Sequence, residues 1–227
     1  MAAEKQPEDQ GRKQGKLTIF ASYFSGAGKS WAMLKAAQEA KDAGVDVVIG
    51  LSAREQWPDT EALAARFERV PCSPVQPNGQ SEDDRNLDAC LARRPQLVLI
   101  DELSHKNADN SRHKKRYQDI QELLKAGADV YTTLDIQHIE SIQDAVFSIL
   151  KAPMEERIPD HVFDRADQVE LIDVEPERLQ QRLMEQKRGA LGSGCSLSQL
   201  SALREVGLRR CADRAALYTR VNHSQTG

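Results

Sequence analysis

The stretch Ser22-Tyr23-Phe24-Ser25-Gly26-Ala27-Gly28-Lys29-Ser30 decides the fold of this 227-residue chain. An apolar run at residues 17–21 leads into it, and a helical pattern at residues 31–43 follows it. A strand, a glycine-bearing loop, the pair Lys-Ser and a helix, in this order, are the parts of a phosphate-binding P-loop. The stretch therefore predicts a site for the phosphates of a nucleotide at a strand-to-helix junction.

Each part of this loop has an expected role. Gly26 and Gly28 allow the backbone to turn tightly and to approach a ligand closely. The amides of residues 26–30 would point into one concavity at the positive end of the following helix. Lys29 is expected to reach the β- and γ-phosphates, and the Ser30 hydroxyl to ligate Mg²⁺. Ser25, Ala27 and Trp31 complete the expected contacts to the nucleotide.

The loop departs from the general pattern at one position. That pattern has a glycine five residues before Gly28, where this chain has Tyr23. Neither Tyr23 nor Ser22 adopts a positive φ easily. The alternative interpretation is a strand-to-helix turn whose glycines serve packing only.

A second motif follows the apolar run Leu97-Val98-Leu99-Ile100. This run predicts a buried strand that brings Asp101 and Glu102 to its carboxyl end, the edge at which open α/β sheets bind ligands. Asp101 is expected to hold Mg²⁺ together with Ser30, and Glu102 to act as general base if the chain hydrolyses nucleotide. An acidic strand end that is merely solvated is the alternative.

Residues 103–116 form a polar, loop-like segment directly after this acidic pair. His105, Arg112 and Arg116 are therefore candidates to sense a γ-phosphate or to bridge to another subunit, and a solvated basic loop is the alternative. The other polar residues expected after a strand, at the same cleft, are Asp135, Gln137 and His138.

Composition excludes several classes of protein. The net charge is −4 and aromatic residues make up 5%, which argues against nucleic acid as a partner. No apolar stretch approaches 18 residues, so no membrane span is expected in this chain. The four cysteines form no Cys-x-x-Cys motif, which is typical of free thiols in a reducing cytosol.

The order of predicted elements defines the fold class. Strands are expected at residues 16–22, 45–51, 66–71, 96–101, 129–133 and 168–173, with helices at 29–43, 81–94, 117–126, 138–150, 177–187 and 196–221 and short helices near 59–65 and 160–166. Strands that alternate with helices indicate a three-layer α/β fold of the P-loop NTPase type, with a mainly parallel sheet, helices on both faces and a C-terminal helical appendage. We expect a disordered lead-in at 1–14, an ATP-binding domain at 15–188, and a hinge with an amphipathic helix at 189–227 that leads to domains absent from this chain.

Several stretches resemble one known family, the KdpD sensor histidine kinases of the bacterial potassium-transport operon, in their N-terminal cytoplasmic region. The similarity runs from about Gly15 to about Ala215. The stretches that carry it are Gly26-Ala27-Gly28-Lys29-Ser30-Trp31-Ala32-Met33-Leu34, residues 97–105, Ser111-Arg112-His113, residues 131–141, and Ala202-Leu203-Arg204-Glu205. This chain departs from the family at two places. The family has glycine at the position of Ser22. The family also usually has Glu-Thr-His-Gly near Ala53-Arg54-Glu55-Gln56, so any ligand contact that the family makes through that segment is not expected in this chain.

The resemblance implies an ATP-binding regulatory domain that modulates the kinase and phosphatase balance of a membrane sensor. ATP and Mg²⁺ are the implied cofactors. The implied partners are the downstream sensor and kinase domains and a cognate response regulator, and the implied place is the cytoplasmic side of the inner membrane. Whether the chain itself is an enzyme stays open, as does a homodimer. An active P-loop ATPase and a protein-interaction module with a vestigial P-loop are the alternatives.

Overall fold

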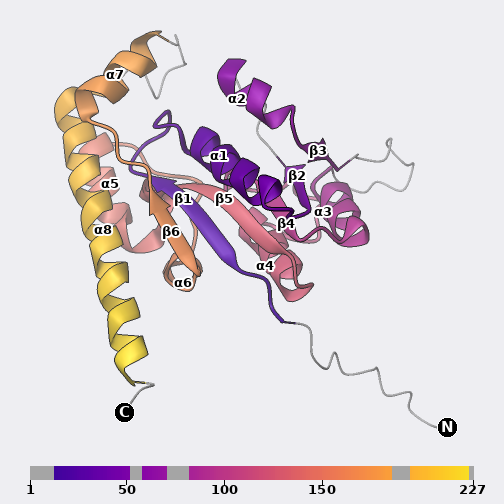
Figure 1. The fold of residues 1–227 in the computed structure, drawn as a ribbon. Helices are drawn as coiled ribbons and strands as arrows, with labels where there is room; N and C mark the ends of the chain where they lie inside the picture. Colours follow the sequence, from indigo (N-terminus) through magenta and orange to yellow (C-terminus); the bar gives the residue numbers. More distant parts are fainter. Residues whose placement is uncertain (1–12, 52–57, 71–81, 186–194, 225–227) are drawn as a thin grey trace.

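The computed structural model describes residues 13–51, 58–70, 82–185 and 195–224. Its centre is a sheet of six strands in the order β3 (Glu68–Arg69), β2 (Val47–Leu51), β4 (Leu97–Ile100), β5 (Asp129–Asp135), β1 (Leu17–Ser22) and β6 (Gln168–Leu171). All of the neighbouring strands pair in parallel (Figure 1). The expected parallel α/β fold is therefore confirmed.

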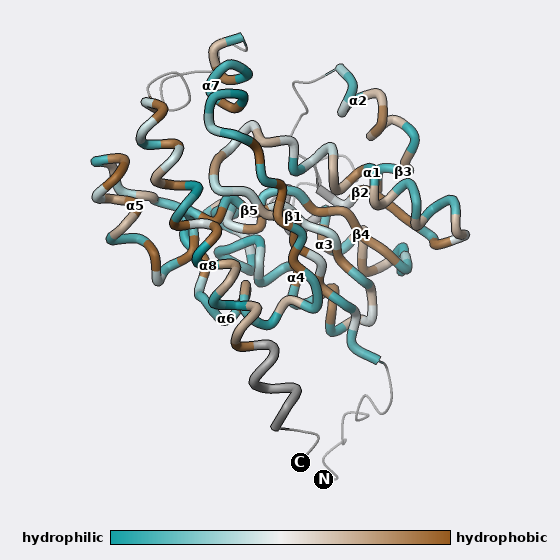
Figure 2. Tube along the Cα trace, turned by 60° about the vertical axis from the view of Figure 1, so that its left-hand side comes forward, coloured by the Kyte–Doolittle hydropathy of each residue, from teal (hydrophilic) through white to brown (hydrophobic). Residues whose placement is uncertain are grey.

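The strands are apolar without alternation because both faces of the sheet are covered. β1 and β4 are buried at every position. Phe20 lies in one core with Met33 and Leu34 of α1 (Lys29–Asp42), whereas its neighbour Ile19 lies in another core. This alternation follows from the two-residue period of a strand. Figure 2 shows the hydrophobic colouring concentrated along these inner elements.

Helices form the two outer layers. α1 and α2 (Pro58–Ala64) contribute to the core on one face. The opposite core contains residues of α3 (Glu82–Arg93), α4 (Arg116–Lys125) and α6 (Asp160–Asp164). The three-layer arrangement expected from the sequence is thus present.

A third apolar cluster joins the C-terminal helices to the start of the P-loop. It contains Tyr23 and Phe24 together with residues of α5 (Gln143–Leu150), α7 (Pro176–Glu185) and α8 (Leu197–Ser224). α8 runs along one side of the molecule in Figure 1, and it packs against α5 and α7. The expected C-terminal helix is present, and its first half packs on the α/β domain. The expected hinge at 189–194 lies outside the described residues, as does most of the lead-in at 1–14.

One predicted element was wrong in its extent. The helix expected at residues 138–150 is divided into two 3-10 turns, η1 (Ile136–His138) and η2 (Glu140–Ile142), and α5. Ile139 is extended, with ψ of 134°, and it pairs in parallel with Ile158. A pairing with a residue so distant in sequence interrupts the helix, and no local pattern shows it.

Candidate functional site

The loop at residues 22–30, which the sequence predicts to be a P-loop and which keeps that name below, has the backbone that close approach of a ligand requires. Gly26 and Gly28 have φ of 90° and 101°, values that favour glycine. Gly28 is the N-cap of α1, and a Cβ atom placed there would meet no heavy atom within 4 Å. The first amides of α1 have no acceptor inside the helix, so they are oriented toward this open space. The loop therefore leaves an open space beside Gly28, bordered by the first amides of α1.

The positions where glycine was expected do not need it. Among the described residues, positive φ at a non-glycine occurs at Arg94, Glu102 and Lys151 only, so Ser22 and Tyr23 are unstrained. The Ser22 hydroxyl donates to the carbonyl oxygen of Phe24 at 2.7 Å and thereby braces the start of the loop.

Lys29 points to the carboxyl edge of the sheet, where β5 ends. Its Nζ donates to Oδ1 of Asp135 at 2.6 Å, and the two side chains keep only 10% and 16% of their exposure. Ser22 Oγ lies 3.1 Å from the same oxygen, within hydrogen-bonding distance. The P-loop cation is therefore held by a carboxylate from the neighbouring strand.

Asp101 lies at the end of β4, and it accepts hydrogen bonds from two hydroxyls. Ser30 Oγ donates to its Oδ2 at 3.1 Å, and Thr133 Oγ1 donates to its Oδ1. The carboxylate is buried, at 3% exposure. A hydroxyl and a carboxylate in contact are the hard oxygen ligands that Mg²⁺ takes alongside phosphate oxygens and water. The residues present thus fit the ion that the P-loop motif implies.

Glu102 follows Asp101 in a left-handed conformation, with φ of 59°. Its amide donates to Oδ1 of Asp101 at 3.1 Å and to Thr133 Oγ1 at 3.0 Å. The Glu102 side chain keeps 55% of its exposure, and a guanidinium nitrogen of Arg116 lies 3.7 Å from it. Partial burial, followed by the nearby Asp101 carboxylate, raises the pKa of Glu102 above its usual value, with Arg116 and His105 opposing the shift. The raised pKa and the remaining solvent access suit the Glu102 carboxylate to accept a proton.

Of the other candidates from the sequence, His105 and Arg112 have partners away from the P-loop, whereas Arg116 contacts the acidic pair. His105 Nδ1 lies 3.4 Å from a carboxylate oxygen of Glu156, on the connection that precedes α6. Arg112 pairs with Asp88 of α3 and lies 3.7 Å from Glu122 of α4. Arg116 donates to the carbonyl oxygen of Asp101 at 2.9 Å and so supports the end of β4.

The two remaining polar candidates from the sequence follow β5. Gln137 is buried in η1, and a ring nitrogen of His138 lies 2.6 Å from the carbonyl oxygen of Glu156. At the other border of the loop, Trp31 projects from the first turn of α1 and is 46% exposed.

Sequence reasoning missed two residues of the site. Thr133 bonds Asp101, and a guanidinium nitrogen of Arg182 on α7 donates to the carbonyl oxygen of Ala27 at 3.4 Å. A hydroxyl near the end of an apolar strand was the available signal for Thr133. Arg182 carried no such signal, because its contact depends on how α7 packs.

The comparisons with known proteins identify the family of this chain. A family model described as "KdpD: Osmosensitive K+ channel His kinase sensor domain" matches residues 13–215. The sensor protein KdpD of Clostridium acetobutylicum is 44% identical over 214 residues, which are 91% of this chain and 24% of that protein. The sensor protein KdpD of Escherichia coli is 43% identical over 208 residues, 88% of this chain and 23% of that protein.

Two further observations concern the length of the matched region and the character of its helices. The chain spans about a quarter of the length of these two relatives. Among the described residues, no helix combines the length and apolar character needed to cross a membrane. The family match covers most of the chain and includes the P-loop, both acidic residues at the end of β4 and most of α8. This chain therefore belongs to the KdpD family, and the region that matches is the family's sensor domain.

Proposed function

We propose that this chain is a regulatory domain that binds Mg²⁺·ATP within a sensor histidine kinase. The observation that carries the proposal is the convergence of Lys29, Ser30 and Asp101 at one edge of the sheet, beneath an open glycine cradle. A cation, a hydroxyl and a carboxylate in this arrangement suit a nucleotide triphosphate with its metal ion.

Binding would exchange the partners of Lys29. The Lys29 ammonium would leave the Asp135 carboxylate for the β- and γ-phosphates, while the amides of residues 26–30 would donate to phosphate oxygens. Ser30 and Asp101 would hold Mg²⁺, which when bound neutralises phosphate charge. Asp135 would then need a new partner, and the Ser22 hydroxyl already lies 3.1 Å from it.

Packing around the P-loop supports a regulatory role. Tyr23 is buried under α8, where a Cβ atom placed at Gly207 would lie 3.1 Å from the Tyr23 Cβ. A Cβ atom at Gly26 would lie 3.1 Å from Leu183 of α7. A change in the conformation of the loop would therefore alter its packing against both α7 and α8. Nucleotide shifts such an equilibrium only if it binds one arrangement better than the other.

The role of the whole protein extends this proposal. Because the matching family model is described as an osmosensitive K⁺ channel histidine kinase sensor domain, we assign the full protein to control of a potassium-uptake operon. The partners would be its own downstream sensor and kinase domains and a response regulator. The domain would lie on the cytoplasmic side of the inner membrane, where a homodimer would bring two such domains together.

One observation favours hydrolysis as a second function. Glu102 has a raised pKa, lies next to Asp101 and keeps solvent access, so it is suited to accept a proton from an attacking water. Glu102→Gln removes that base. Loss of ATP turnover in this variant, with ATP binding kept, would support hydrolysis by this chain. Absence of turnover in the wild type would contradict hydrolysis and favour a domain that only binds ATP.

The test of the main proposal is calorimetric titration of ATP with Mg²⁺. The wild type is expected to bind, and Lys29→Ala and Lys29→Met to lose binding while remaining folded by circular dichroism. Lys125→Ala, which removes an exposed lysine at the end of α4, is the matched control and should bind as the wild type does. A folded wild type that binds no nucleotide would contradict the proposal and favour a protein-interaction module.

A further inference from the structure

A pocket of about 760 Å³ borders the P-loop, and neither Asp101 nor Asp135 lines it. The loop residues Gly26, Ala27 and Gly28 form one border, and the walls come from α1, α2, β6 with the segment that follows it, and α7. Neither Lys29 nor Ser30 lines it, because both side chains are directed to the carboxylates at the ends of β5 and β4. The loop therefore separates a metal-binding side from this pocket.

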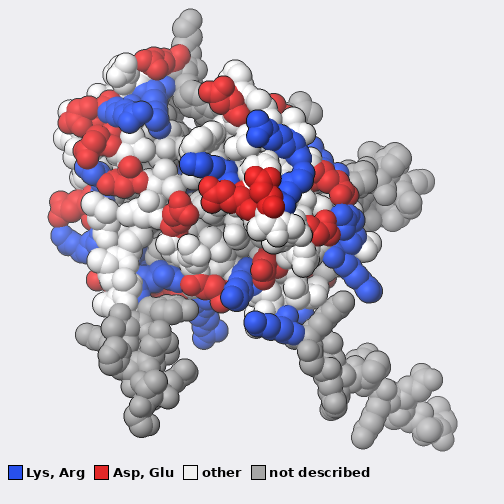
Figure 3. Space-filling model, viewed as in Figure 1, with Lys and Arg blue, Asp and Glu red and all other residues white. Residues whose placement is uncertain are grey.

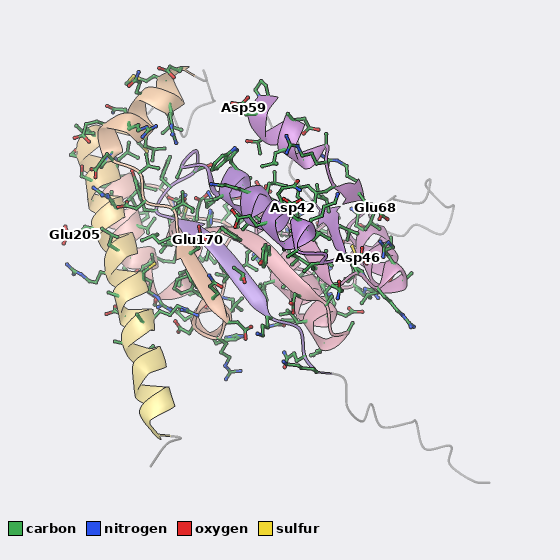
Figure 4. All side chains as sticks on the ribbon, viewed as in Figure 1. Asp42, Asp46, Asp59, Glu68, Glu170 and Glu205 are labelled. Atoms are coloured by element: carbon green, nitrogen blue, oxygen red, sulfur yellow. The ribbon has the colours of Figure 1, made fainter. Side chains whose placement is uncertain are left out.

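The charge of the pocket does not suit phosphate. Its lining contains four carboxylates and two cations, a formal charge of 2 − 4 = −2, and these residues are Glu39, Asp59, Glu170, Glu185, Lys35 and Arg182. Figure 4 labels Asp59 on α2 and Glu170 on β6, which come from elements on either side of α1. Figure 3 shows acidic and basic side chains interspersed on this face of the molecule. Carboxylates accept hydrogen bonds from hydroxyl and amino groups, so an uncharged polar ligand fits better than an anion.

Trp31 supplies an apolar surface in the lining of this pocket. It directly follows Ser30, and it is 46% exposed although it is one of the largest apolar side chains in the protein. Lys35, one turn further along α1, has its Nζ 5.4 Å from the centre of the Trp31 ring. An exposed indole that is steadied in this way next to a phosphate loop suits stacking by a planar base.

We infer that this pocket is the nucleoside subsite: a purine base stacks on Trp31, and the ribose hydroxyls and the exocyclic amino group meet the carboxylates of the lining. The inference rests on the proposed function, because the P-loop must hold the triphosphate. A triphosphate whose γ end lies toward Ser30 and Asp101 leaves its nucleoside on the opposite side of the loop, where the pocket opens.

The same position places the nucleoside against α7. Arg182 of this helix lines the pocket and contacts the P-loop at Ala27, and α7 in turn packs on α8. The base and ribose, rather than the phosphates alone, would then be sensed by the C-terminal helices. An inorganic polyphosphate would occupy the loop without this contact.

The experiment compares Mg²⁺·ATP with Mg²⁺·tripolyphosphate as probes of the full chain. Trp31→Ala should weaken ATP binding about tenfold, as loss of a base–aromatic stack does, and leave tripolyphosphate binding unchanged. Trp31→Phe should keep most of the affinity for ATP because it keeps a ring. Phe147→Ala is the control, since Phe147 is a similarly exposed aromatic side chain on α5, at 52% exposure, and does not line the pocket.

Fluorescence gives a second readout that does not depend on affinity. In a Trp57→Phe background, ATP should quench the emission of Trp31 and tripolyphosphate should not. Trp31→Ala that binds ATP as tightly as the wild type would overturn the subsite, and so would equal losses for both probes. Failure of the wild type to bind either probe would instead overturn the proposed function, and the subsite with it.

Discussion

The ion pair between Asp135 and Lys29 allows a prediction about stability that nucleotide should reverse. Asp135→Asn keeps the shape of the side chain and an acceptor for Ser22 but removes the charge that faces Lys29 at 2.6 Å. Both side chains are largely buried, so the ammonium is left without its counter-ion in a place where water does not fully replace it. A hydrogen bond between charged groups contributes roughly 1.5–3 kcal/mol, and we expect a loss of about 2 kcal/mol in the free energy of unfolding.

The assay is thermal denaturation with and without saturating Mg²⁺·ATP. Without nucleotide, a loss of this size lowers the melting temperature by about 4–8 °C for a domain of this length. With nucleotide, the difference from the wild type should shrink, because the phosphates would then be the partners of Lys29 in both proteins and ATP would bind Asp135→Asn more tightly.

The control is Asp213→Asn, which removes an exposed carboxylate on α8 and should change stability by less than about 0.5 kcal/mol. Unchanged stability of Asp135→Asn without nucleotide would refute the reasoning about the pair. An equal loss at saturating ATP, in a variant that binds ATP, would refute the exchange of partners.

Three further predictions concern the packing around the loop. Burial raises the pKa of Tyr23 to about 12, and its hydroxyl donates to a backbone carbonyl at 2.8 Å, so Tyr23→Phe should cost about 1 kcal/mol in urea denaturation, and an unchanged midpoint would contradict this. Burial alone would raise the pKa of Asp160, but hydrogen bonds from Ser141 and the Arg210 guanidinium outweigh it and hold that pKa below its usual value. The Asp160 carboxylate therefore contributes its full stabilisation above the unfolded pKa, and that contribution is lost as the pH falls through the folded pKa. Asp160→Asn should make the free energy of unfolding fall less steeply on the acid side. An unchanged slope would contradict a lowered pKa of Asp160. Gly26→Ala should destabilise more than Gly44→Ala, since both have φ of 90° but only the first would crowd a neighbouring side chain; equal losses in thermal denaturation would show that the backbone strain alone matters.

Most of the fold could be predicted from local pattern. The strands at residues 17–22 and 97–100 and the helix at 29–42 lie within one or two residues of the expected bounds. Their signals are short-range, since an apolar run, a glycine and a cap act within a few residues. The error at 138–150 has the opposite origin, because the parallel pairing of Ile139 with Ile158 is not a local property.

The sequence by itself determined the chemistry available at the site. Two glycines that accept positive φ, a lysine and a serine that open a helix, and an acidic pair after a buried strand are all properties of neighbouring residues. These were enough to predict the α/β fold, which the structure confirms, and they are the basis of the proposed ligand, because each depends on backbone conformation or side-chain chemistry close to the motif.

Only the tertiary structure decided which of these groups meet. β5 lies between β1 and β4, so it is Asp135, 106 residues from Lys29, that holds the lysine, and Thr133 that bonds Asp101. The same packing directs Arg112 to α3 and encloses a pocket between α1 and α7. Strand order and helix packing depend on the burial of apolar surface over the whole chain, so they cannot be predicted from any single segment of the sequence.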